Sequence, residues 1–514
     1  MGKGQRVRES RAAEKEAMKV MLAKKAKKKK TTTIVTSIIA AVLVLCLAAG
    51  FIYQTVYQSA YSRGDIQRGT VVMQTENYTV DATMMSYYFF TQYNTFVNNY
   101  SSYVTSIGLD PNVSLRRQDS TFQSGSTWFE YFCDQTSAQV KEMLYLAEKA
   151  LAAGMKLEEA DQKTIQTALD SYKEFAKENS YKEDKIFSMV FGTGVQESDV
   201  RKCLELSTLA DKFYKDYNGK LVYTDAEIEQ YYKDNIKTYL YVDYYTYDVE
   251  AKDTKDSATY ADAKARADAL AAVKSGEDFA KWVEADIRAN TPITKDYTEE
   301  DLEDHIEETL AGLKLNKVTR VTDNAASTWM FDTAKVGETY IEDDESGTYT
   351  VYYLTATPYR DESATKNIRQ LVFTKASYDK DLAKAKAAAE DVMKKLKDEG
   401  LTDDAFLTYA AEYSEDGNTA GTGGLCENFA ANAFDTAVSA WAFKEGRAAG
   451  DFELVEITDG YAICYFIGEG ETAWKADCIS AKKTADYTAA YEEWTKAITL
   501  TENKNGYEKI PDNV

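Results

Sequence analysis

The segment Asn367-Ile368-Arg369-Gln370-Leu371-Val372-Phe373 begins the stretch, residues 367–468, that decides the fold of this chain. Its short apolar alternation predicts a strand. An Ala/Lys/Asp-rich run from Asp379 to Glu399 follows and predicts a helix that ends at Gly400. The stretch therefore begins with a strand that is followed by a helix.

The rest of the stretch continues this order. A second predicted helix carries Phe406 and leads to Ser414-Glu415-Asp416 and a Gly-rich turn, residues 421–424. Trp441-Ala442-Phe443 then precedes a closing strand, residues 460–466. This order of strand, two helices, Gly-rich loop, short helix and strand resembles the parvulin family of peptidyl-prolyl isomerases. The resemblance implies a small antiparallel sheet flanked by helices.

An internal repeat precedes this stretch, because residues 242–357 follow the same order. Trp329-Met330-Phe331 matches the later Trp-Ala-Phe motif, and residues 348–354 match the closing strand. The earlier copy has an acidic insertion, residues 286–324, in place of the Gly-rich loop. The sequence therefore predicts two parvulin-like domains in tandem.

A helical block comes before the two copies, and it resembles the amino-terminal region of SurA- and PrsA-like foldases. A plain helical bundle remains an alternative, since helical periodicity alone fits both. The resemblance also implies that the carboxyl end packs back on this block. The predicted fold class is α+β. The predicted parts are a basic cytoplasmic tail (1–30), a transmembrane anchor (31–53), a helical chaperone-like domain (64–240), a degenerate parvulin-like domain (241–360), a second parvulin-like domain (366–470) and a C-terminal extension (471–514).

The predicted anchor follows from the charge pattern near the N-terminus. Residues 1–30 carry a net charge of +9 in a chain whose net charge is −23, so the remainder carries −32. Residues 31–53 contain no charged side chain and are long enough to cross a bilayer as one helix. Because Lys and Arg concentrate on the cytoplasmic flank, we expect a single-pass protein of the cell membrane with an extracytoplasmic body. A cleaved signal peptide is the less favoured alternative.

Composition excludes several classes of function. An acidic body is repelled by the nucleic-acid backbone, so no nucleic-acid partner is expected. The single histidine, His305, lies among carboxylates on a predicted solvated helix and argues against Ser/His/Asp triads and most metallohydrolases. Six scattered cysteines have no zinc-site spacing, although Cys464 and Cys478 could pair. We therefore expect no metal and no cofactor.

An isomerase of this type needs neither nucleophile nor metal. Rotation about an X-Pro bond has a barrier of ~18–20 kcal/mol, and catalysis requires an apolar pocket and polar groups that favour the twisted amide. The family resemblance implies two histidines, an acid and an apolar floor. Gln370 and Ala462 occupy the two histidine places, while Asp416 occupies the acid place. Asp416 is equally well read as a turn residue before Gly417.

The floor and the neighbouring substrate surface are also carried over from the resemblance. Phe434 and Val438 hold the floor positions, and Trp441 and Phe443 are assigned to substrate binding, although their repetition in the first copy favours a core role. In the first copy, Tyr244 and Thr350 are assigned to the histidine places, so no catalysis is expected there.

The resulting hypothesis is a membrane-anchored foldase that binds unfolded or newly exported polypeptides. Its isomerase activity is expected to be weak, or to have been lost altogether, which would leave a holding chaperone. The alternative from another class is a non-catalytic protein that reuses the parvulin fold to bind one envelope partner. Binding of unrelated unfolded chains separates the two classes.

Overall fold

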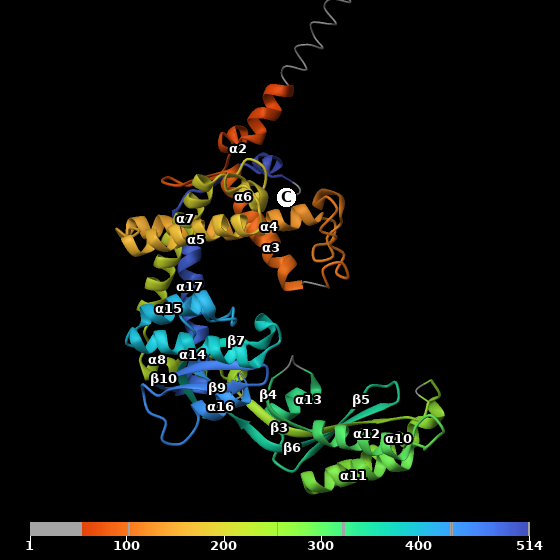
Figure 1. Cartoon of the computed structure of the whole chain (residues 1–514). Coiled ribbons are helices and arrows are strands. Elements are labelled where there is room, and N and C mark those ends of the chain that lie inside the picture. The colour runs from red at the N-terminus through yellow and green to blue at the C-terminus, as the bar shows by residue number, and fades with distance from the viewer. Residues whose placement is uncertain are drawn as a thin grey trace, which may run out of the picture. The chain divides into compact units, whose positions relative to one another are not determined.

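The computed structural model describes residues 54–100, 103–253, 255–320, 324–431, 433 and 435–511 (Figure 1). The predicted anchor, 31–53, lies outside these residues. Within them, no helix is both long enough and apolar enough to cross a membrane. The chain divides into two compact units. One contains residues up to Leu221 together with those from Tyr487 onward, and the other contains Val222–Asp486.

The first unit is mostly helical, with one small sheet. Its main elements are β1 (Val71–Gln74), β2 (Thr79–Asp81), α3 (Ala82–Tyr100), α4 (Trp128–Ala152), α5 (Glu159–Glu178), α6 (Ile186–Phe191), α7 (Glu197–Lys220), the end of α17 (Ala473–Ala497), β11 (Thr501–Glu502) and the 3-10 helix η8 (Lys504–Lys509). Shorter helices are α2 (Asp65–Arg68), η2 (Leu115–Arg117) and η3 (Glu183–Lys185).

Local sequence explains where the helices of this unit begin. Asp81 caps α3, because its Oδ1 accepts hydrogen bonds from the backbone N–H groups of Thr83 and Met84 at 2.9 and 3.1 Å. Thr127 and Glu130 form a reciprocal capping box at the start of α4. The apolar faces of these helices then meet in one buried core.

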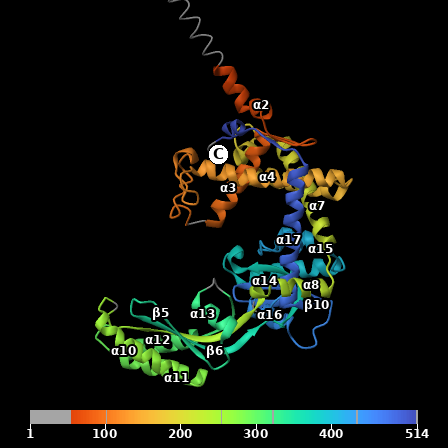
Figure 2. The ribbon, with the colours of Figure 1, turned by 180° about the vertical axis from the view of Figure 1, so that it is seen from behind.

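The carboxyl end of the chain completes the first unit, as the family resemblance implied. β11 pairs antiparallel with β1, and Glu502 lies opposite Met73. Tyr507 and Ile510 are buried in the same core as the helices. α17 appears as one continuous helix in Figure 2 and contributes Trp494 to this core. Residues more than 400 positions apart therefore share one hydrophobic core.

Each parvulin-like copy lies in the second unit, after α8 (Asp225–Asp234) and α9 (Ile236–Tyr239). The elements of the first copy are β3 (Tyr241–Glu250), η4 (Ser257–Thr259), α10 (Tyr260–Ala271), α11 (Gly276–Asn290), α12 (Glu299–Gly312), β4 (Lys314–Thr319), α13 (Ala325–Thr328), the short π-turn η5 (Trp329–Thr333), β5 (Thr339–Asp343) and β6 (Thr348–Tyr359). Those of the second copy are β7 (Ala364–Thr374), η6 (Lys375–Tyr378), α14 (Leu382–Asp398), α15 (Asp403–Tyr413), η7 (Ala420–Thr422), β8 (Leu425–Phe429), α16 (Thr436–Ala442), β9 (Phe452–Ile457) and β10 (Gly460–Thr472).

The two copies have the same topology. The sheet orders are β4-β3-β6-β5 and β8-β7-β10-β9, and all pairings are antiparallel. In each copy the longer helices cover one sheet face, and the short helix before the third strand covers the other (Figure 1). The predicted repeat, with a small antiparallel sheet flanked by helices, is confirmed.

One expectation about the first copy is wrong. Residues 286–324 are not merely an acidic insertion, since they include α12 and the edge strand β4. α12 buries Leu302 and Ile306 against the sheet and leaves its acidic residues and His305 exposed. The acidic segment therefore completes the domain rather than interrupting it. All five described cysteines are free, so Cys464 and Cys478 do not pair.

A single carboxylate fastens the carboxyl-terminal segment to α4. Glu502 accepts hydrogen bonds from Ser137 Oγ and Tyr507 Oη, both at 2.9 Å, and lies 2.8 Å from Lys141 Nζ. Burial works against the charged form, but the bonds from Lys141, Ser137 and Tyr507 outweigh it and hold the pKa of Glu502 below its ordinary value.

We predict that Glu502→Ala loosens this segment without unfolding the second unit. Hydrogen exchange of the amides in residues 501–510 should accelerate about tenfold or more, equivalent to roughly 1.5 kcal/mol for a lost charged hydrogen-bond set. Glu508→Ala is the matched control, because that side chain is 71% exposed in its ion pair with Arg116.

The same contact predicts a pH dependence. The pKa of Glu502 is lowered in the folded state. The stability that this carboxylate contributes is therefore fully present above its pKa in the unfolded chain, about 4.3, and is lost as pH falls through its pKa in the folded protein. Exchange at acidic pH should therefore rise more in the parent protein than in Glu502→Ala. Equal acid sensitivity in both proteins would contradict the role given to this carboxylate.

Candidate functional site

The two histidine places of the second copy lie on the same face of its sheet. Gln370 on β7 is opposite Cys464 on β10, and Ala462 is opposite Val372. Successive residues of a strand point to opposite faces, so all four share one face. α16 packs over this face. The buried apolar cluster beneath it contains Ile368, Cys426, Phe429, Val438, Trp441, Ala442, Ala462, Cys464 and Phe466.

Gln370 and Asp416 are in direct contact. Gln370 Nε2 donates to Asp416 Oδ2 at 3.0 Å, and Gln370 is only 3% exposed. Thr419 Oγ1 donates to the same carboxylate oxygen at 2.6 Å. The backbone N–H of Asn418 donates to Oδ1 at 3.1 Å. Asp416 is therefore a turn residue that also contacts Gln370, and its place as the acid of the site stays a prediction.

The Gly-rich turn brings this loop against β7. The backbone N–H of Gln370 donates to Gly424 O at 2.8 Å. Gly424 has φ +72°, and a Cβ at that position would lie 2.2 Å from Gln370 O. Only glycine satisfies both the left-handed backbone and this close approach. The turn is thus required to place Asp416 beside Gln370.

A buried arginine holds the same turn from the opposite face of the sheet. Arg369 Nη1 donates to the carbonyl oxygens of Thr422 and Gly423 at 2.9 and 2.8 Å, and Nη2 lies 2.7 Å from Asp403 Oδ1. Its guanidinium also lies 5.2 Å from the centroid of the Phe406 ring. Neighbouring residues of one strand therefore position the site from both faces.

The remaining groups near Asp416 are not nucleophiles. Burial and, after it, the Asp416 carboxylate raise the pKa of Cys426 to about 12, so this cysteine is a neutral thiol. Ala462 is fully buried between Val372 and Val455 on the adjacent strands, and it offers no polar atom. Among the described residues there is no cluster of side chains suited to holding a metal ion. The site combines one amide–carboxylate pair with an apolar sheet face.

Comparison with known proteins identifies both copies. Residues 371–468 and residues 223–343 each match a family described as the PPIC-type PPIase domain. The chain carries two parvulin-type domains. By this resemblance they are peptidyl-prolyl isomerase domains, and they follow a helical block in tandem.

Other comparisons add less. A search of curated proteins finds no match. A crystal structure of the peptidylprolyl isomerase PrsA from Bacillus anthracis matches with 13% identity over 56% of this chain and 96% of that chain, with a TM-score of 0.18. That likeness carries no conclusion here, so the assignment rests on the two family matches and the sheet topology.

The predicted substrate surface of the second parvulin domain lies mostly inside the protein. Val438 is 1% exposed and Trp441 is 6% exposed, while Phe443 is half-buried. Trp441 Nε1 donates to Glu453 Oε2 at 2.8 Å, and the Arg447 guanidinium lies 4.2 Å from the centroid of its ring. This packing gives Trp441 a core role. Phe434, the other predicted floor residue, lies outside the described residues.

The strand register of the first parvulin domain corrects one assignment. The N–H of Thr246 donates to Leu313 O at 3.0 Å, just as that of Gln370 donates to Gly424 O. Thr246, not Tyr244, therefore holds the place of Gln370. Tyr244 instead lies opposite Leu354 in the buried cluster.

The other assignment in that domain agrees with the register. Thr350 lies opposite Asp248, as Ala462 lies opposite Val372, and Thr350 Oγ1 donates to Asp248 Oδ1 at 2.6 Å. The first parvulin domain thus has threonines at both histidine places.

The two tryptophans of the repeat occupy equivalent places. Trp329 stacks on Tyr340 of β5 with ring centroids 5.4 Å apart, and Trp441 contacts Glu453 of β9. Tyr340 and Glu453 correspond in the register, since Tyr340 lies opposite Tyr352 and Glu453 opposite Cys464. Both indoles therefore pack on the same position of the third strand.

Sequence reasoning missed two residues that build the site, Thr419 and Arg369. Thr419 is a buried hydroxyl shortly before the Gly-rich turn, and a Ser/Thr residue following Asp in a turn is a common capping pattern. Arg369 is a charge inside a strand that is otherwise apolar, which is the signal that could have identified it.

We predict that Gly424→Ala disrupts the second parvulin domain. The substitution combines a left-handed backbone with a clash against Gln370 O, and it should cost about 2–4 kcal/mol in that domain. The amides of β7 and β8 should lose protection from hydrogen exchange. Gly417→Ala is the control, because a Cβ there meets nothing within 4 Å. Equal effects of the two substitutions would contradict the role of the close approach.

Proposed function

We propose that this protein is a membrane-anchored foldase that binds unfolded polypeptides, and that its second parvulin-type domain retains weak isomerase activity. The hydrogen bond between Gln370 Nε2 and Asp416 Oδ2, on the apolar face of a PPIC-type domain, is the observation that carries the proposal. A foldase function of this coarse kind is supported by the two domains together. Anchoring, the bound substrate and the surviving activity are the parts we propose.

The site supplies part of what isomerisation needs. Twisting an X-Pro amide reduces its charge separation, so an apolar surface favours the twisted form over the planar one. Gln370 can donate and accept hydrogen bonds, and Asp416 with Thr419 holds its amide in place. Ala462 contributes no hydrogen bond where the family has its second histidine. Losing such a polar contact reduces catalysis roughly a hundred- to a thousandfold, by analogy with oxyanion donors.

Binding of unfolded chains is less demanding than catalysis. It depends mainly on burial of apolar surface, which the histidine replacements barely change. The first parvulin-type domain, with Thr246 and Thr350 in the histidine places, is assigned a binding role alone. Within this proposal, one domain binds and the other binds and weakly isomerises.

The residues at the start of the chain provide the proposed attachment. Residues 31–53 form the anchor, with residues 1–30 in the cytoplasm and the remainder outside, because the basic cluster precedes the uncharged run. Newly exported polypeptides would then meet the foldase as they leave the membrane.

We predict that Asp416→Ala separates the two activities. The acceleration that the full chain gives to proline-limited refolding of a client should fall about a hundredfold, because Gln370 loses the carboxylate that positions it. Suppression of aggregation of a proline-free unfolded client should stay unchanged. Asp398→Ala, at an exposed residue of α14, is the control and should behave as the parent in both assays.

Three outcomes bear on this prediction. Acceleration that survives Asp416→Ala would show that the site is elsewhere. No acceleration by the parent, with aggregation still suppressed, would leave a holding chaperone. Failure to bind any unrelated unfolded client would instead support a protein dedicated to one folded partner.

We predict that the body is accessible from outside the cell. Protease added to intact cells stripped of their wall should digest the part after residue 53, while an epitope tag placed before residue 30 should survive. Lysed cells, in which the tag is also digested, serve as the control. Protection of the body in intact cells would overturn the proposed topology.

A further inference from the structure

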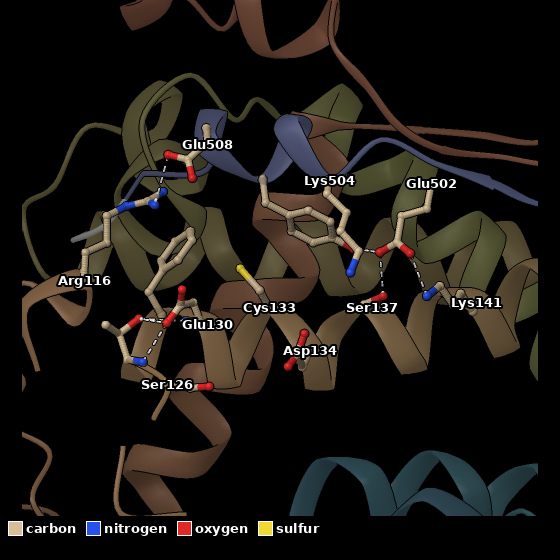
Figure 3. A pocket seen from close by; sticks show the side chains of 13 residues that line it. Arg116, Ser126, Glu130, Cys133, Asp134, Ser137, Lys141, Glu502, Lys504 and Glu508 are labelled. Atoms are coloured by element: carbon tan, nitrogen blue, oxygen red, sulfur yellow. Dashed lines mark hydrogen bonds and ion pairs between the residues drawn. The ribbon is translucent and has the colours of Figure 1, made fainter. Parts of the chain in front are cut away.

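A polar groove in the first unit has no role in the functions described so far. It has a volume of about 610 Å³ and lies between α4 and the carboxyl-terminal segment (Figure 3). The α4 wall includes Cys133 and Ser137, and the opposite wall includes Lys504 and Tyr507. All of its lining residues belong to the first unit.

Two ion pairs join the walls of the groove. Arg116 Nη1 lies 3.3 Å from Glu508 Oε2, and Lys141 Nζ lies 2.8 Å from Glu502 Oε2. Figure 3 shows these pairs on opposite sides of Cys133. The Arg116 guanidinium also covers the Phe129 ring, 3.4 Å from its centroid. The space over Cys133 therefore has an ion pair at each end, and the charges within each pair neutralise one another.

Three charged groups of the lining are not neutralised by these pairs. Glu130 and Asp134 lie one turn apart on α4, and both are exposed. Glu130 is bonded to Thr127 and Asp134 to Gln123, which leaves both carboxylates without an ion pair among the described residues. Lys504, on the opposite wall, also has no ion pair in the described part of the chain. One wall thus presents two carboxylates and the other a single ammonium group.

We propose that this groove binds an extended polypeptide segment that carries a Lys or Arg side chain. The basic side chain lies against Glu130 and Asp134, and the polar backbone lies along the hydroxyl group of Ser126. An acyl chain does not fit, because it would strip water from charged groups without replacing their hydrogen bonds. An anionic ligand is disfavoured, because four carboxylates line the groove against three cations.

The size of the groove agrees with such an occupant. Pockets for small ligands have volumes of about 300–1,000 Å³, so the groove has room for a few residues but not for a folded domain. The acidic remainder of the chain would attract a basic segment over a longer range. The identity of the occupant as an unfolded client rests on the proposed foldase function.

Cys133 gives a direct test of occupancy. Among the described cysteines it alone is half-buried, while the other four are buried, and it belongs to the α4 wall of the groove. Burial raises its pKa, so iodoacetamide should react with it slowly and at alkaline pH. The full chain is incubated with capped Gly/Ser hexapeptides that carry one central Lys, Glu or Gln. Alkylation is measured by mass spectrometry of the fragment that contains Cys133, which separates it from Cys46.

We expect the Lys hexapeptide to slow alkylation of Cys133 at least threefold, and the Glu and Gln hexapeptides to have no effect. Asp134→Lys should weaken the protection by the Lys hexapeptide about tenfold, because it replaces an attraction by a repulsion. Lys504→Glu should strengthen it, and this second variant keeps the test valid if the first does not fold. Glu178→Lys, at an exposed residue of α5 outside the groove, is the control and should change nothing.

The possible results distinguish failure of the groove proposal from failure of the foldase proposal. Equal protection by the Glu and Lys hexapeptides overturns the charge preference. No protection by any hexapeptide, in a protein that still suppresses client aggregation, overturns the groove as a peptide site and leaves the foldase proposal standing. Protection by the Lys hexapeptide in a protein that suppresses no aggregation supports the groove and overturns the foldase proposal.

Discussion

The antiparallel ladder between the first and last strands of each parvulin-type domain is the constraint on which the rest of the second unit depends. β7 and β10 pair from Thr374 and Gly460 to Ala364 and Thr472, and β3 and β6 pair in the same way. This ladder decides which side chains face the long helices and which face the short one. A slip of one residue would exchange Gln370 for Arg369 and leave a guanidinium under α16. Position in the ladder, more than residue type, therefore defines the site.

Much of this architecture is predictable because its signals are local. Strand alternation and the repeated Trp motif each depend on a few neighbouring residues, and the structure confirms them. α12 escaped prediction, since its many carboxylates conceal the two buried apolar residues, Leu302 and Ile306. The acidic segment has the composition of a surface loop but the spacing of a helix.

The site was predictable only in part. The motifs alone indicate Gln370 and Asp416, but their contact depends on a turn closed by Thr419 and Gly424. The register irregularities in β3, between Tyr241 and Tyr244, account for the misplaced residue of the first domain. Such irregularities change which residue of the neighbouring strand lies opposite each later residue, and no sequence pattern indicates where they occur. The burial of Val438 and Trp441 likewise depends on how α16 packs, which composition does not reveal.

The pairing of β11 with β1 has a consequence for biosynthesis. A polypeptide emerges from the ribosome with its N-terminus first, and domains generally fold as they appear. Residues 222–486 can complete their sheets while the first unit still lacks a strand and the core residues Trp494, Tyr507 and Ile510. The part that is synthesised first is thus among the last to mature. A premature stop codon near residue 500 would act as a lesion of the amino-terminal half, although every residue of that half had been translated correctly.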